Sequence, residues 1–108
     1  MTAASPVYAL KMSDQATLES FRRYAASVEV LGLKAYKATV TLGERLDGDL
    51  ITRVTLLVDD PQGDTWEVSV VRELRKTLGR RATDLGLPPV SLTLVPKREA
   101  HMVEAFAH

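Results

Sequence analysis

The sequence predicts an α+β fold of four strands and two helices, in the order strand, helix, strand, strand, helix, strand. Three observations support this prediction. Four segments alternate apolar and polar residues, two longer segments repeat apolar residues every three or four positions, and turn-forming residues separate them. With 108 residues, of which 45% are hydrophobic, the chain is long enough for one domain with a single core.

The four alternating segments are expected to be half-buried strands, because a period of two places the apolar side chains on one face of a sheet. They span residues 7–12, 33–42, 50–58 and 90–95. Within the second and third segments, the residues expected on the apolar face are Tyr36, Ala38, Val40, Leu42, Val54, Leu56 and Val58.

The two helices are expected at about 14–31 and 64–85. In the first, Leu18, Phe21, Ala25 and Val28 form one apolar stripe. The second begins with Asp64-Thr-Trp-Glu67, which has the pattern of a capping box, and Gly79 is expected to end or kink it. An alternative stays open: residues 65–71 also alternate and would form a fifth strand paired with 50–58.

This order of elements resembles the ferredoxin-like fold over about residues 6–95. The resemblance implies a four-stranded antiparallel sheet with both helices on one face, in a single domain at 1–96. Residues 97–108 are expected to form a short helical tail, because Met102, Val103 and Phe106 lie one, three and four positions apart. The resemblance predicts no particular activity, because this fold supports many functions.

Composition excludes several classes of function. The chain has no cysteine, which excludes disulfides, thiolate metal sites and cysteine nucleophiles. Both histidines lie in the tail, and no glycine-rich phosphate loop is present. We therefore expect no catalytic residue, no metal, no cofactor and no enzymatic activity. No apolar run approaches the roughly 20 residues of a membrane span, and the first residues lack a secretory pattern, so a soluble, cytoplasmic protein is expected.

The 14 acidic and 14 basic residues balance, but they are separated along the chain. Residues 44–67 hold seven acids and two bases, whereas 68–98 hold seven bases and two acids. The second predicted helix carries a basic stripe that would suit phosphate or nucleic acid, although no aromatic residue interleaves it. The stripe consists of Arg72, Arg75, Lys76, Arg80 and Arg81.

The open face of the predicted sheet is too apolar to remain in water as a group. Either a second subunit or the tail of the same chain would cover it, and we favour a second subunit with help from the tail. The expected interaction residues are Ile51, Arg53, Leu57, Met102 and Phe106. The sequence thus favours a self-assembling or partner-binding module, as a homo-oligomer or a subunit of a larger complex. Nucleic-acid or phosphate binding through the basic stripe is the alternative. An enzyme that holds a small ligand between stacked sheets, near Arg53 or Lys37, is a third reading.

Overall fold

The computed structural model describes residues 12–106. Residues 7–11 of the first predicted strand lie outside this range, and Met12 begins the first helix. The described elements are α1 (Met12–Ala26), β1 (Glu29–Val30), β2 (Leu33–Glu44), β3 (Leu50–Val58), α2 (Val68–Asp84), β4 (Val90–Pro96) and the 3-10 helices η2 (Lys97–Met102) and η3 (Glu104–Phe106).

The sheet is mixed, so the predicted ferredoxin-like antiparallel sheet is wrong. Its strands lie in the order β1-β2-β3-β4, with β3 antiparallel to β2 and parallel to β4. A ferredoxin-like sheet places a further strand between the two strands that the second helix connects. Here β3 and β4 are direct neighbours, from the pair Thr52–Val90 to the pair Val58–Pro96. Alternation identifies strands and their buried faces, but it carries no information about which strands are neighbours.

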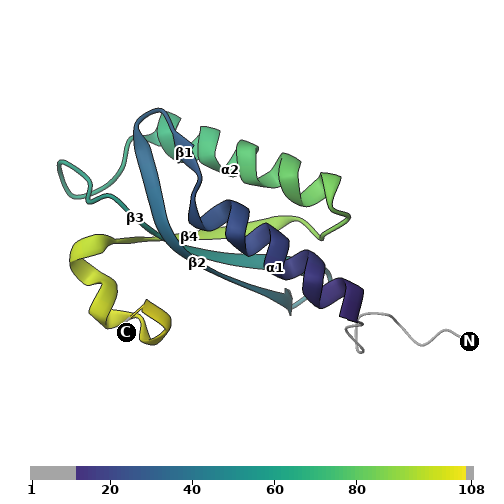
Figure 1. Cartoon of the computed structure of the whole chain (residues 1–108). Coiled ribbons are helices and arrows are strands. Elements are labelled where there is room, and N and C mark those ends of the chain that lie inside the picture. The colour runs from purple at the N-terminus through teal and green to yellow at the C-terminus, as the bar shows by residue number, and fades with distance from the viewer. Residues whose placement is uncertain (1–11, 107–108) are drawn as a thin grey trace, which may run out of the picture.

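Both helices pack on one face of the sheet, and the main core lies between them (Figure 1). Phe21 and Ala25 of α1, and Leu74 and Leu78 of α2, are at most 1% exposed. The alternation of β3 supplies the sheet side of this core, because Val54, Leu56 and Val58 are all at most 1% exposed. Burial of these side chains is the dominant favourable term in folding.

A tight hairpin replaces the end of the first predicted helix, which stops at Ala26 and not at residue 31. Val30 pairs with Leu33 across the two-residue turn Leu31-Gly32, whose φ angles of 49° and 88° are both positive. This is the pattern of a type I′ turn. The predicted face of Tyr36 is also wrong, because the register shifts between Ala35 and Lys37 and Tyr36 is 39% exposed.

Helix α2 begins at Val68, so both predictions for the preceding segment are wrong. The N-cap Glu67 makes no side-chain cap hydrogen bond, and residues 65–67 are neither helix nor strand. Gly79 does not end the helix. The ending lies at Gly86, whose φ is 74°, where the Leu87 amide donates to the Ala82 carbonyl at 2.8 Å. Together with the bond from Gly86 N–H to the Thr83 carbonyl, this forms a Schellman motif.

The chain after β4 folds across the sheet face opposite the helices (Figure 1). There Phe106 forms a second, smaller cluster with Leu57 and Val95, and Ala100 and Val103 pack against it. The three main residues are 4%, 7% and 8% exposed. The segment 97–106 thus covers part of the face that was expected to meet a second subunit.

Candidate binding groove between α2 and β4

Strand β4 forms one edge of the sheet, and no other described strand pairs with its outer side. The Thr52 amide donates to the Pro89 carbonyl at 2.8 Å. Because the direction of backbone groups alternates along a strand, Ser91 and Thr93 also face β3. The amides and carbonyls of Val90, Leu92 and Leu94 therefore point to the open edge. No charged residue lies within Val90–Pro96.

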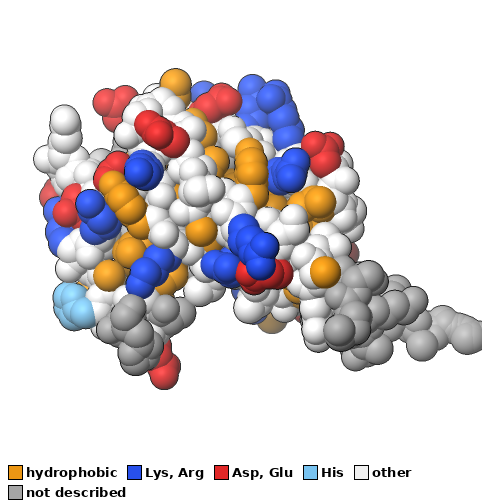
Figure 2. Space-filling model, in the orientation of Figure 1, with side chains coloured by type: hydrophobic (Ala, Val, Ile, Leu, Met, Phe, Trp, Pro, Cys, Tyr) orange, Lys and Arg blue, Asp and Glu red, His pale blue; other side chains and the backbone are white. Residues whose placement is uncertain are grey.

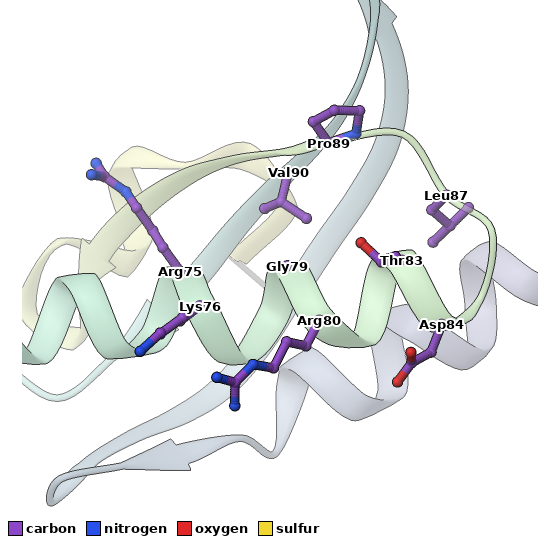
Figure 3. Close-up of a pocket in the computed structure, with 9 residues that line it drawn as sticks. All are labelled: Arg75, Lys76, Gly79, Arg80, Thr83, Asp84, Leu87, Pro89 and Val90. Atoms are coloured by element: carbon purple, nitrogen blue, oxygen red, sulfur yellow. The ribbon is translucent and has the colours of Figure 1, made fainter.

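A groove runs between α2 and the beginning of β4 (Figure 3). Its volume is about 590 Å³. Apolar side chains from the loop and from β4 form one wall, and the polar side chains of α2 form the other. The lining residues are Arg75, Lys76, Gly79, Arg80, Thr83, Asp84, Leu87, Pro89 and Val90.

Gly79 keeps the helix wall low at the point where Val90 faces α2 (Figure 3). A Cβ atom placed on Gly79 would meet no atom within 4 Å, so close packing does not require glycine here. Glycine in a helix interior costs roughly 0.5–1 kcal/mol relative to alanine. The chain therefore carries a destabilising residue whose one visible effect is to leave the groove open.

The opposite wall is fixed to the sheet from below. The Thr52 hydroxyl is fully buried and donates to the Pro88 carbonyl at 2.8 Å, next to the bond from Thr52 N–H to Pro89. The Schellman motif fixes Leu87 on the other side of the two prolines. Hydrogen bonds at both ends and two prolines leave this loop little freedom, so the groove is preformed.

The basic stripe divides into side chains with different surroundings. Arg81 lies over the ring of Tyr24, with its guanidinium carbon 5.1 Å from the ring centroid, and thus contacts α1. Arg75 extends toward β4, whereas Lys76 and Arg80 extend to the other side of α2 (Figure 3). Among the described residues, no carboxylate forms an ion pair with any of the four exposed cations Arg72, Arg75, Lys76 and Arg80. Figure 2 shows Lys and Arg side chains over α2, with acidic side chains among them.

The residues predicted on the open sheet face do not form one exposed patch. Ile51 and Leu57 are buried at 6% and 7% exposure, and Phe106 covers Leu57. Met102 is 71% exposed. Arg53 lies across Gly43, where an added Cβ would come within 2.8 Å of its guanidinium carbon, and its Nη2 donates to the Glu44 carbonyl at 3.3 Å.

An acidic junction around Asp59 and Asp60 joins three parts of the fold. Asp59 accepts hydrogen bonds from the Tyr36 hydroxyl at 2.6 Å and from the Lys34 amide at 3.1 Å. Lys97 Nζ lies 3.9 Å from Asp59 and 4.4 Å from the centroid of the Tyr36 ring. The hydrogen bond from the Tyr36 hydroxyl to the Asp59 carboxylate lowers the pKa of Asp59 and raises the pKa of Tyr36.

The same junction holds the loop before α2 and the beginning of η2. The indole Nε1 of Trp66 donates to the Asp59 carbonyl at 2.9 Å, and the Arg98 amide donates to Asp60 Oδ1 at 3.0 Å. These acids therefore have structural partners. In residues 12–106, no three His, Cys, Asp or Glu side chains are placed to hold a metal ion.

Sequence reasoning found the cations of the site but missed its apolar wall and the strand edge. The available signals were a glycine inside a helical pattern and a strand without charge. Neither signal indicates a groove until β4 is known to pair with β3 and to lie beside α2. No family model, no curated protein and no solved structure matches the chain. Within the described part, neither helix is long and apolar enough to cross a membrane.

Proposed function

We propose that the chain is a partner-binding module that binds an extended protein segment on the outer edge of β4, beside the groove to α2. The observation that carries this proposal is the uncharged outer edge of β4, with which no other strand within residues 12–106 pairs. Natural sheet edges are usually protected by charge, proline, bulges or a covering element. Within β4 the one such device is Pro96 at its end; residues 90–95 carry no charge and no proline, and no other strand of residues 12–106 pairs with their outer side, so an added strand would satisfy their open amides and carbonyls.

The preformed groove supports the same proposal, because a strand added to β4 would project alternate side chains toward α2. Self-association through the open sheet face, which the sequence favours, has weaker support. Of the apolar residues predicted to take part, Ile51, Leu57 and Phe106 are each at most 7% exposed within one chain, whereas Met102 is 71% exposed.

The test is a selection of extended peptides on the purified protein, followed by hydrogen exchange. The amides of Val90, Leu92 and Leu94 should exchange quickly in the free protein and become protected when a selected peptide binds. The double variant Ser91→Lys/Thr93→Lys, which places charge on the exposed side of the edge strand, should weaken binding. Failure to select any peptide, or peptides that leave these three amides unprotected, would contradict the proposal.

Nucleic-acid binding is the second candidate, because four cations of α2 are exposed without a carboxylate partner among the described residues. A backbone-phosphate interaction predicts binding that falls steeply with salt. Reversing charge at Arg75 and Arg80 should then abolish it. Binding of a single-stranded oligonucleotide that is insensitive to salt, or no binding at low salt, would rule this candidate out.

A further inference from the structure

The charge and shape of the groove narrow the class of segment that β4 would accept. We infer that the partner segment is an acidic strand, antiparallel to β4, with a carboxylate opposite Arg75 and an apolar side chain over Gly79. This inference rests on the proposed function. It assigns a chemistry to the partner that the open edge alone does not.

Arg75 is the cation that an added strand would meet. It lines the groove and extends toward β4, and no described carboxylate lies within ion-pair distance of it. A carboxylate brought to it by a bound strand would be partly shielded from water by the groove walls. A hydrogen bond to a charged group in such a position contributes more to binding than an exposed surface pair does.

The groove position over Gly79, which would take the apolar side chain of the partner, lies at a distance from Arg75 that matches the spacing of side chains in a strand. Gly79 and Arg75 are four residues apart, which is about 6 Å along a helix. Two residues of a strand cover roughly 6.6 Å and place their side chains on the same face. One side chain of an added strand, opposite Val90, would thus lie over Gly79 between Leu87 and Val90. The side chain two residues away, opposite Leu92, would reach Arg75.

The orientation fixes the order of the two residues in the partner. Antiparallel pairing is slightly more stable per residue than parallel pairing. In an antiparallel strand, the residue opposite Leu92 precedes the residue opposite Val90. The expected pattern is therefore acidic, any residue, apolar.

A second copy of the chain fits this edge less well. Pairing two β4 strands would bring two α2 helices to the same face on either side of the seam. Both Arg75 side chains extend toward that seam, and like charges placed across an interface oppose binding. Nucleic acid would satisfy Arg75 but not the outward amides and carbonyls of β4.

The experiment uses the full chain and three fluorescent peptides of about ten residues, a length that covers the seven of β4. One carries glutamate, threonine and leucine in the expected order, one has glutamine for glutamate, and one has the order reversed. We expect the first peptide to bind about tenfold more tightly than the second, which corresponds to about 1.4 kcal/mol. Arg75→Gln should remove that difference. Arg72→Gln is the matched control, because it removes an exposed arginine of the same helix that does not line the groove, and it should leave the difference intact.

Gly79→Leu tests the apolar position, with Gly79→Ala as control for the change in helix propensity. Filling the groove should weaken binding of the first two peptides, while leaving the fold intact by circular dichroism. Equal binding of the glutamate and glutamine peptides, both weakened by Gly79→Leu, would overturn the acidic inference and keep the proposed function. No binding by any peptide would overturn both, and binding of an oligonucleotide instead would identify the second candidate function.

Discussion

Replacement of Phe106 by alanine tests whether the chain covers its own sheet. The ring is 4% exposed and packs on Leu57 and Val95, which are 7% and 8% exposed. Full burial of a phenylalanine side chain contributes about 1.5–3 kcal/mol. The segment 97–106 packs in a cluster separate from the main core and can detach without unfolding that core, so the loss of stability cannot exceed the free energy of docking this segment. We expect the free energy of unfolding to fall by about 2 kcal/mol.

Urea unfolding followed by fluorescence of Trp66, the single tryptophan, measures this change. Met102→Ala is the matched control, since Met102 belongs to the same segment but is 71% exposed. Its effect should stay within about 0.5 kcal/mol. Light scattering at low and high salt, on the wild type and on Phe106→Ala, gives the oligomeric state.

Equal unfolding energies for the two variants would refute the packing of Phe106 on Leu57 and Val95. A wild-type oligomer that survives high salt and becomes a monomer in Phe106→Ala would also refute it. In that case the ring would contact a neighbouring subunit, and the self-association expected from the sequence would regain its support.

Three further substitutions test local features of the fold. Gly79→Ala should stabilise the protein by roughly 0.5–1 kcal/mol, since the added methyl meets no atom within 4 Å, and thermal unfolding without a gain would contradict this. Leu31→Asn should raise the melting temperature, because Leu31 has a φ of 49° and asparagine tolerates that region; a lower value would show that the exposed leucine packs productively. Asp59→Asn should destabilise the protein at neutral pH, because the folded pKa of Asp59 is lowered. This difference from the wild type should be complete above about pH 5, shrink as the pH falls through 4 and toward the folded pKa, and a pH-independent difference would contradict it.

The buried faces of β3 and of the second half of β2 follow from local alternation, which is why the sequence predicted them. Val54, Leu56 and Val58 fall on the core side as expected. Tyr36 does not, because the register shift beside it exchanges the two faces. No local pattern marks that shift. With the shift, the Tyr36 hydroxyl reaches Asp59, which lies 23 residues away in the sequence, and a local pattern does not display such a contact.

The order of strands depends on contacts that are remote in sequence, and this part of the prediction failed. The pairing of β3 with β4 joins residues such as Thr52 and Val90 across the whole of α2. The capping-box pattern at Asp64 failed for a related reason. Trp66 makes a hydrogen bond to the Asp59 carbonyl, which holds the segment in a non-helical conformation, so the helix begins after Glu67.

The candidate site combines the basic stripe of α2, which the sequence shows, with the groove beside β4, which the sequence does not show. The sequence shows the cations of α2 as a stripe at helical spacing. It does not show that Arg75 extends toward β4 and Lys76 away from it, because that depends on where β4 lies. Gly79 connects the two features, because it weakens α2 without a packing reason and lies opposite Val90. If Gly79→Ala is more stable than the wild type while Gly79→Leu loses peptide binding, then Gly79 lowers the stability of α2 and keeps the groove open for binding. Such a separation of stability from binding is typical of residues that serve function.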